Sequence, residues 1–259
     1  MKALILYFSG TGNTMYVAKI IGEELNKLGV ETELHSTEEN FAICANTYDL
    51  LILGCPKYYE CPTLDFIKYI KKYLPVSAKA IPTLMFITQA GPLATDSESI
   101  TQLLARKNHR LVVSKSFAFS NNMMIFSFFK ATGDAKIKEN IAQIRSEAAS
   151  LLRGFLNGDI NNESIGAFKS FFEWLVAVIF TKLMPVFGMK YSVSDACTGC
   201  GLCAKKCPKG NITMLEKRPH FGRKCIFCMR CINGCPANAI LYNKKKCLQY
   251  HAPTFKPAP

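Results

Sequence analysis

The sequence predicts an α/β fold with a doubly wound parallel sheet, followed by a small α+β domain that contains most of the cysteines. Two observations support this prediction. Apolar runs of strand length alternate with segments of helical periodicity over residues 2–156, and eight of the twelve cysteines lie between residues 197 and 235. Strands that alternate with helices at this spacing are typical of βαβ units, in which helices cover both faces of a parallel sheet.

Five strands and four helices are expected in the N-terminal part of the chain. The strands are predicted at 2–8, 30–35, 49–54, 81–88 and 111–119. The helices are predicted at 13–28, 64–74, 97–107 and 134–156. This pattern fits a five-stranded sheet in the order 2-1-3-4-5, and such sheets bind ligands outside the carboxyl ends of their strands.

Two copies of one cysteine spacing, C-x₂-C-x₂-C-x₃-C-P, begin at Cys197 and Cys225, and each cysteine of the second copy is equivalent to one of the first. An iron–sulfur cluster needs four soft thiolates, and in this spacing the cysteine before the proline ligates the other cluster. The spacing therefore predicts two [4Fe–4S] clusters. The first is assigned to Cys197, Cys200, Cys203 and Cys235, and the second to Cys225, Cys228, Cys231 and Cys207.

Zinc and disulfides explain this cysteine pattern less well. A tetrahedral zinc site has no role for the third cysteine of a C-x₂-C-x₂-C run, and disulfide scaffolds are expected in short secreted chains. Thiolate clusters also require a reducing compartment, which favours the cytoplasm. The segment 191–242 resembles a two-cluster bacterial ferredoxin along its whole length.

The loop after the first strand carries a second motif, Ser9-Gly10-Thr11-Gly12-Asn13-Thr14. Hydroxyl side chains and closely approaching backbone amides at a helix N-terminus are suited to bind a phosphate, because unpaired amides and the helix dipole both favour an anion. With the strand before it and the helix after it, this loop resembles the FMN-binding signature of flavodoxins. The alternative is an ordinary turn that leads into a helix.

The resemblance to flavodoxins implies two further flavin loops. After the third strand, Tyr58 or Tyr59 would stack on the isoalloxazine ring, and Lys57 would tune its potential. After the fourth strand, backbone groups would meet the pyrimidine edge of the flavin. The candidate residues of these two loops are Pro56, Lys57, Tyr58 and Tyr59, and Thr88, Gln89, Ala90 and Gly91.

The formal net charge of +13 raises the question of a nucleic-acid partner. The basic runs are short, and those at 205–206, 223–224 and 244–246 are not interleaved with aromatic residues as a nucleic-acid groove requires. A positive surface is better explained by electrostatic steering of acidic redox partners. We therefore expect protein redox partners and no nucleic acid.

The apolar segment 159–190 is expected to form a helix. A membrane span needs about 20 predominantly apolar residues, and here Lys169, Glu173 and Lys182 interrupt the run. We expect no transmembrane span but a helix packed between two domains, with peripheral membrane contact through 168–189 as the alternative. The expected domains are a flavodoxin-like domain at 1–158, a helical linker at 159–190, a two-cluster domain at 191–245 and an extended tail at 246–259.

The whole chain resembles the flavodoxin–ferredoxin fusion proteins of anaerobic bacteria and archaea. That resemblance implies an electron-transfer protein in which FMN and two [4Fe–4S] clusters exchange electrons with low-potential redox partners. FMN accepts one or two electrons and each cluster accepts one. Two alternatives stay open, a reductase whose FMN acts directly on a small substrate or nicotinamide, and a ferredoxin with a flavin-free docking domain. An electron carrier is favoured over a flavin-dependent oxidoreductase.

Overall fold

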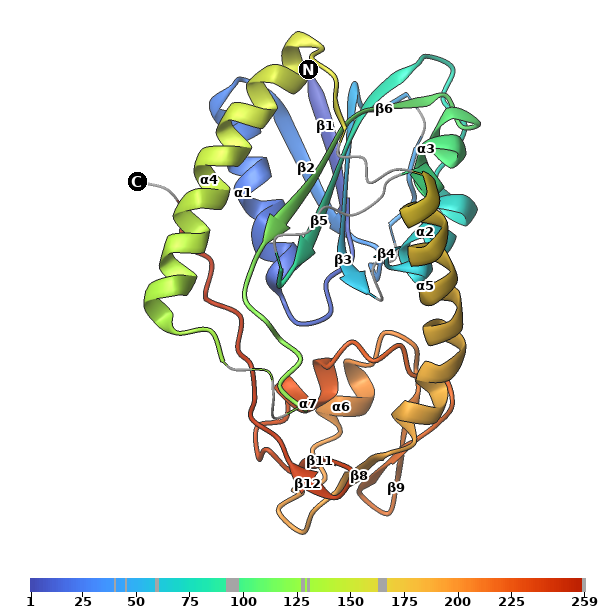
Figure 1. Cartoon of the computed structure of the whole chain (residues 1–259), viewed down its shortest axis with the longest axis vertical. Helices are drawn as coiled ribbons and strands as arrows, with labels where there is room; N and C mark the ends of the chain where they lie inside the picture. Colours follow the sequence, from blue (N-terminus) through green and yellow to red (C-terminus); the bar gives the residue numbers. More distant parts are fainter. Residues whose placement is uncertain are drawn as a thin grey trace. The chain divides into compact units, whose positions relative to one another are not determined.

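The computed structural model of the chain consists of two compact units (Figure 1). The first unit comprises Met1–Phe119, Gly133–Ala177 and Thr254–Pro259, and the second comprises Ser120–Thr132 and Val178–Pro253. The units therefore alternate along the sequence. The structure describes residues 1–39, 41–44, 46–58, 61–91, 98–126, 129, 131–162 and 167–257.

The first unit is built on a parallel sheet in the order β2-β1-β3-β5-β6-β7. Its strands are β1 (Lys2–Tyr7), β2 (Glu31–Ser36), β3 (Leu50–Tyr58), β5 (Ile81–Gln89), β6 (His109–Ala118) and β7 (Asn161–Asn162). The first five strands of this order confirm the predicted doubly wound arrangement, since β4 is a short extra strand. The two-residue β7 extends the sheet beyond β6.

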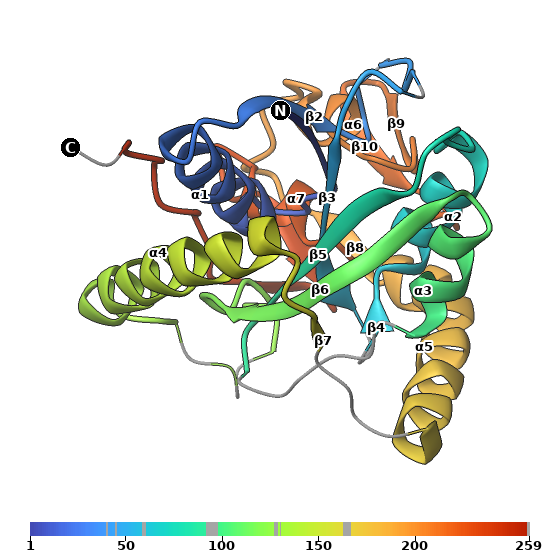
Figure 2. The ribbon, with the colours of Figure 1, turned by 90° about the horizontal axis from the view of Figure 1, so that it is seen from above.

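Helices cover both faces of this sheet. Figure 2 shows α1 and α4 on one face and α2 and α3 on the other. The helices are α1 (Asn13–Lys27), α2 (Leu64–Tyr73), α3 (Glu98–Ala105) and α4 (Asp134–Asn157). The central strands are apolar on both faces because both faces are covered, and Ile5, Ile52 and Leu84 are completely buried in the core.

The segment after the third predicted strand differs from expectation. The third strand is predicted to end at Gly54, but β3 continues to Tyr58 and pairs antiparallel with β4 (Cys61–Pro62). The hydroxyl of Thr63 donates to the carbonyl of Pro56 at 2.7 Å and closes this hairpin. The side chain of Thr63 thus supplies a contact that strand propensity does not indicate.

The C-terminal residues of the first unit pack against α1 and α4. The ring of Phe255 meets that of Tyr16 edge-on at 5.1 Å between centroids, with the ammonium of Lys19 5.3 Å from its centre. Arg145 donates to the carbonyl of Lys256 at 2.8 Å. Residues 247–257 have no regular secondary structure, and Phe255 is held by these contacts.

The second unit repeats one short motif twice. Its elements are β8 (Tyr191–Val193), α6 (Leu202–Lys205), β9 (Ile212–Leu215), β10 (Arg218–Phe221), α7 (Arg230–Asn233), β11 (Ile240–Tyr242) and β12 (Lys245–Lys246). Helices α6 and α7 occupy equivalent places in the two copies of the cysteine motif, and so do the starts of β9 and β11. The sheets are β12-β11-β8 and β10-β9, all antiparallel.

Aromatic rings form the core of the second unit. Tyr191 lies 5.8 Å from Phe227 and 5.3 Å from Tyr242 between ring centroids, and Phe227 lies 5.6 Å from Tyr242. Phe126 meets Tyr242 edge-on at 6.1 Å. Phe126 belongs to a segment that follows β6 in the sequence. The segment 120–132 is therefore part of this unit by packing, which the sequence pattern did not indicate.

The helix expected in the apolar segment is α5 (Ala167–Gly188). Its part Phe171–Gly188 is long and apolar enough to cross a membrane, and 22% of that part is buried. Large apolar side chains are exposed along it, among them Phe171, Phe172, Ile179 and Val186. The helix thus presents an apolar surface.

Candidate functional site

The predicted phosphate loop joins β1 to α1 at the carboxyl end of the sheet. Gly12 precedes the helix with φ 111°, a conformation that glycine adopts without strain. The backbone N–H of Gly12 donates to the hydroxyl oxygen of Ser9 at 3.1 Å, so Ser9 braces the loop. The first turn of α1, which the structure describes in full, contains no acidic residue. The positive end of the helix dipole therefore faces this loop without a carboxylate in that turn.

Hydrogen bonds connect the three loops that were predicted to surround the flavin. Phe8 N–H donates to the carbonyl of Gly54 at 2.9 Å, and the hydroxyls of Thr14 and Thr88 lie 2.7 Å apart. Pro56 is paired with Thr88 in the register of β3 and β5. The structure thus brings 9–14, 56–58 and 88–91 to the same edge of the sheet.

The individual candidates differ in exposure. Asn13, Thr14 and Thr88 are buried, whereas Ala90 and Gly91 are exposed. Pro56 is buried, and Lys57, Tyr58 and Gln89 are half-buried. Tyr59, the other candidate for stacking, lies outside the described residues. Tyr58 is therefore the candidate for stacking on the flavin ring whose position the structure describes.

The donor set of the loop fits a phosphate monoester. Residues 9–14 offer hydroxyls and backbone amides and contain no carboxylate. Thr14 and Thr88 share one hydroxyl proton in their mutual bond, so the pair carries a second proton that can be donated. Because a phosphate is an acceptor only, such a set of donors matches its chemistry.

The four cysteines assigned to the first cluster line one pocket. The pocket encloses about 370 Å³ of space between atoms, part of it open to solvent, and Cys197, Cys200, Cys203 and Cys235 all line it. Its other walls are mainly apolar, including Val193, Leu202, Met214 and Ile240. The fourth thiol comes from the second copy of the motif. The lining therefore has the crossed composition that the spacing predicts.

The electrostatic coupling between thiols follows the same crossed sets. Burial raises the pKa of Cys228 to about 12, and the neighbouring thiols of Cys225 and Cys207 add to the rise. Burial also raises the pKa of Cys203, and there Cys235 and Cys200 are the thiols that add to the rise. Since buried thiolates need a compensating positive charge, these sets suit iron ions.

Backbone amides point at motif sulfurs in equivalent places. Asn211 N–H donates to Cys207 Sγ, and Ala239 N–H donates to Cys235 Sγ, each at 3.3 Å. Phe227 N–H donates to Cys225 Sγ, also at 3.3 Å. Hydrogen bonds to ligand sulfurs raise the reduction potential of a cluster by stabilising its added negative charge.

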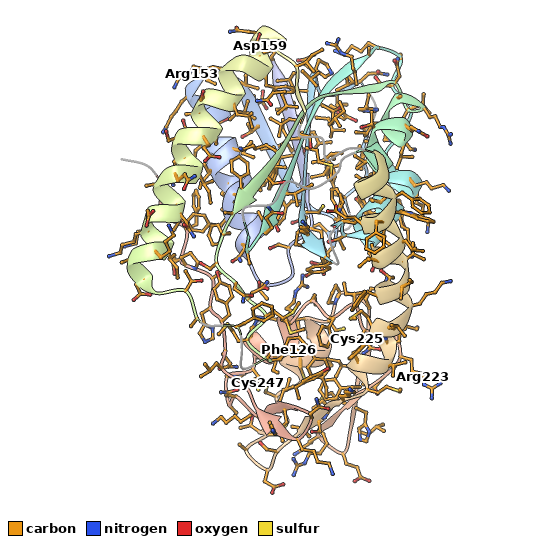
Figure 3. All side chains as sticks on the ribbon, in the orientation of Figure 1. Phe126, Arg153, Asp159, Arg223, Cys225 and Cys247 are labelled. Carbon is orange, nitrogen blue, oxygen red and sulfur yellow. The ribbon has the colours of Figure 1, made fainter. Side chains whose placement is uncertain are left out.

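No three described His, Cys, Asp or Glu side chains surround a single-ion site. This is compatible with a cubane, because each of its four irons takes a different thiolate. Figure 3 labels Cys225, which lies in the second unit ahead of α7. The sequence did not predict the residues that surround its loop, which are Gly188, Tyr191, Phe227 and Met229. The one signal in the sequence that could have indicated them is that Phe227 and Met229 replace glycines of the first copy.

A phosphate-type loop at the sheet edge and two crossed sets of thiols define an electron-transfer protein that uses flavin and iron–sulfur chemistry. Comparison with known families agrees. The family model described as flavodoxin domain matches residues 4–134, half of the chain, and the model described as 4Fe-4S dicluster domain matches residues 196–240. The chain therefore belongs to the flavodoxin domain family, fused to a 4Fe-4S dicluster domain. These domains imply FMN and [4Fe–4S] clusters as cofactors.

Similar proteins cover parts of the chain. An uncharacterised ferredoxin of Methanocaldococcus jannaschii is 40% identical over 62 residues, which is 24% of this chain and 32% of the relative. The match thus spans about a third of that curated relative. A flavodoxin from the domain Archaea is 15% identical over 60% of this chain and 99% of its own, with a TM-score of 0.43. Flavodoxin 2 of Bacillus cereus is 19% identical over 59% and 99%, with a TM-score of 0.40.

Proposed function

We propose that this protein is an electron carrier that passes electrons between FMN, two [4Fe–4S] clusters and acidic, low-potential redox proteins. The observation that supports it most is the pocket lined by Cys197, Cys200, Cys203 and Cys235 in the same chain as a flavodoxin domain. FMN exchanges one or two electrons and each cluster exchanges one, so together they can connect two-electron and one-electron reactions.

The flavin phosphate would be held by the loop of Ser9, Gly10, Thr11, Gly12, Asn13 and Thr14. Ser9 keeps the loop in shape through its bond to Gly12, and Thr14 is oriented by Thr88. The flavin ring would lie between the loop of Pro56, Lys57 and Tyr58 and the loop of Thr88–Gly91. These residues bind and orient the cofactor; its redox chemistry is that of the flavin.

The cluster ligands would follow the crossed sets. Cys197, Cys200, Cys203 and Cys235 would hold cluster one, and Cys225, Cys228, Cys231 and Cys207 would hold cluster two. The apolar walls of the first pocket and the aromatic core near the second loop would limit the access of water to the clusters. Limited water access and sulfur hydrogen bonds are the protein's means of setting cluster potentials.

A redox titration of the anaerobically purified protein, with FMN and iron quantified, tests the carrier proposal. We expect one FMN and two clusters whose potentials overlap closely enough for reversible exchange. A flavin potential far above both clusters, or steady NAD(P)H turnover with only a small-molecule acceptor present, would contradict a pure carrier.

The flavin loop is tested separately by removing one hydroxyl of the pair formed by Thr14 and Thr88. We expect Thr14→Val to weaken FMN binding roughly tenfold, the loss of one or two hydrogen bonds, in a fluorescence titration of the apoprotein. Thr83→Val is the matched control, since Thr83 is also buried on β5 and bonds within its own strand, to the carbonyl of Ile81 at 3.2 Å. Equal weakening by both variants would contradict the assignment of Thr14.

The exposed apolar surface of α5 supports peripheral membrane contact through 168–189 as an additional property. We expect the protein to float with phosphatidylcholine vesicles, which are zwitterionic and test apolar contact alone. The double variant Phe171→Ser, Phe172→Ser should reduce flotation. Tyr73→Ser, which removes an exposed aromatic ring from α2, is the control. Unchanged flotation in the double variant, or none in the native chain, contradicts this contact.

A further inference from the structure

The two copies of the cysteine motif share one backbone conformation at two loop positions but carry different residues there. Gly199 and Gly201 of the first copy both have φ 71°, and their counterparts Phe227 and Met229 have φ 59° and 61°. Glycine adopts such angles freely, whereas other residues do so at a cost. The first loop thus lacks side chains where the second has two large ones.

The large side chains of the second copy are buried against its loop. Phe227 is 4% exposed and Met229 is 2% exposed. Among the eight motif cysteines, all of which the structure describes, Cys200 alone is exposed, whereas its counterpart Cys228 is half-buried. The first loop is therefore the more accessible to a partner.

Other chain segments cover the second copy further. Asn233 in α7 is buried; it donates to the carbonyl of Asn122 at 3.1 Å and accepts from Tyr250 N–H at 3.0 Å. The equivalent helix α6 ends instead at Lys205, whose side chain is exposed. The segments around residues 122 and 250 thus cover α7, whereas the last turn of α6 is exposed to solvent.

Positive charge is also distributed unevenly between the two copies of the cysteine motif. Residues 178–253 contain thirteen Lys and Arg against two Asp and Glu, so they account for most of the net charge of +13. Exposed Lys205, Lys206 and Lys209 follow the first loop directly. The equivalent positions of the second copy are uncharged and hold Asn233, Gly234 and Ala237.

A fourth lysine reaches the first loop from the β9–β10 hairpin. Glu216 and Lys217 form its turn with φ 49° and 61°, as in a type I′ turn. A Cβ placed on Gly199 would lie 2.9 Å from the Cβ of Lys217, so this lysine packs directly against the loop. Lys217 is exposed, and its charge lies beside the proposed ligands of cluster one.

We propose that the surface formed by Cys200, Lys205, Lys206, Lys209 and Lys217, the cluster-one face, is the docking site for an acidic protein that carries one electron at a time. The proposal rests on the proposed function, because it assigns the exchange to one of the two clusters. One electron passes between cluster one and the redox centre of the partner, which is oxidised or reduced by one equivalent. The centre that loses the electron is oxidised as the other is reduced, and no bond forms between the two proteins. Exposed lysines orient the acidic partner, and the uncovered loop keeps the transfer distance short.

A paramagnetic anion locates the face on the native holoprotein. The probe is tris(oxalato)chromate(III), which carries three negative charges and broadens proton signals near its binding site. We expect it to broaden the hyperfine-shifted β-proton signals of Cys197, Cys200, Cys203 and Cys235 before those of the other four ligands, at low salt. Equal broadening of both sets, or earlier broadening of the second set, overturns the proposal.

Charge-matched variants test the lysines. We compare Lys205→Gln, Lys206→Gln, Lys209→Gln with Lys244→Gln, Lys245→Gln, Lys246→Gln, which removes the same charge from three other exposed lysines of the same unit. The probe is an acidic flavodoxin, with binding measured by titration at low and high salt. We expect the first variant to weaken binding roughly tenfold and the second to change it less than twofold. Equal effects of the two triple variants overturn the proposal. It is also overturned if a single-stranded 20-mer DNA binds more tightly than the flavodoxin does and depends on the same three lysines.

Failure of this proposal is distinguishable from failure of the proposed function. If FMN is absent or does not equilibrate with the clusters, the redox titration shows it, whereas anion broadening needs only the two assembled clusters. If the titration succeeds and broadening favours cluster two, the carrier function stands and the docking face is wrong.

Discussion

The two copies of the cysteine motif have the same spacing, the same left-handed loop positions and the same short helix, yet they differ in their surroundings. The first copy has glycines in its loop, exposed lysines after it and one exposed thiol. The second has Phe227 and Met229 in its loop and an aromatic core against it. Identical ligand chemistry is thus placed in two environments, which suits an accessible centre and a protected one.

Magnitudes explain why the second copy tolerates residues in a conformation that favours glycine. A non-glycine residue in the left-handed region costs about 1–2 kcal/mol. Burial of a phenylalanine or methionine side chain contributes about 1.5–3 kcal/mol. For Phe227 and Met229, which are almost completely buried, packing therefore outweighs the backbone strain.

The largest expected effect comes from replacing the fourth ligand of each cluster, Cys235 or Cys207, by alanine. Cys235→Ala should abolish the same electron paramagnetic resonance signal as Cys200→Ala, although the two residues lie in different copies, and iron should fall from about eight to about four per chain. Cys207→Ala should instead match Cys228→Ala. Cys247→Ala, a buried cysteine outside the motifs, should leave iron unchanged. Pairing of each fourth cysteine with its own copy would disprove the crossed sets.

Removing the ring of Phe227 is the next largest perturbation. Phe227→Ala should lower the free energy of unfolding by about 3 kcal/mol, because a ring is lost from the aromatic core. Phe227→Gly loses the same ring but should be about 1 kcal/mol less destabilising, since glycine adopts φ 59° freely. Denaturant unfolding of the anaerobic holoprotein measures both. A glycine variant less stable than the alanine variant would show that φ at 227 is unstrained.

A methyl group at Gly188 should disturb the second copy alone. A Cβ there would lie 2.3 Å from the Cβ of Cys225, and overpacking of this kind costs about 1–3 kcal/mol. A change from glycine to alanine in a helix normally raises the free energy of unfolding, so the sign of the measured change tests the contact. Gly133→Ala, with no described atom within 4 Å of the new Cβ, serves as the control. Stabilisation by Gly188→Ala would refute this contact.

The smallest effect concerns a single hydroxyl. The Tyr191 hydroxyl donates to Met229 Sδ at 3.5 Å, so Tyr191→Phe should lower the free energy of unfolding by about 0.5 kcal/mol. The ring stays, so the aromatic core is preserved. Tyr73→Phe, at an exposed position, should have no measurable effect. A loss above about 2 kcal/mol for Tyr191→Phe would indicate a role beyond this contact.

Much of the fold followed from local pattern. The strand and helix positions of the first unit agree with the structure to within a few residues, because apolar periodicity reports burial directly. The hairpin of β3 and β4 did not follow, since it depends on a bond from Thr63 to Pro56 rather than on strand propensity. Membership of 120–132 in the second unit also depended on contacts between segments far apart in the chain, such as Asn122 with Asn233.

The sequence by itself determined the cofactor chemistry, because the cysteine spacing and the phosphate loop are short motifs of residues that are close together in the chain. It also indicated the doubly wound sheet through alternating strands and helices. Only the tertiary structure decided which cysteine copy is covered and which is accessible. That difference arises from packing between distant segments, as with Gly188 on Cys225 and Lys217 on Gly199, and such contacts leave no periodic trace in the chain.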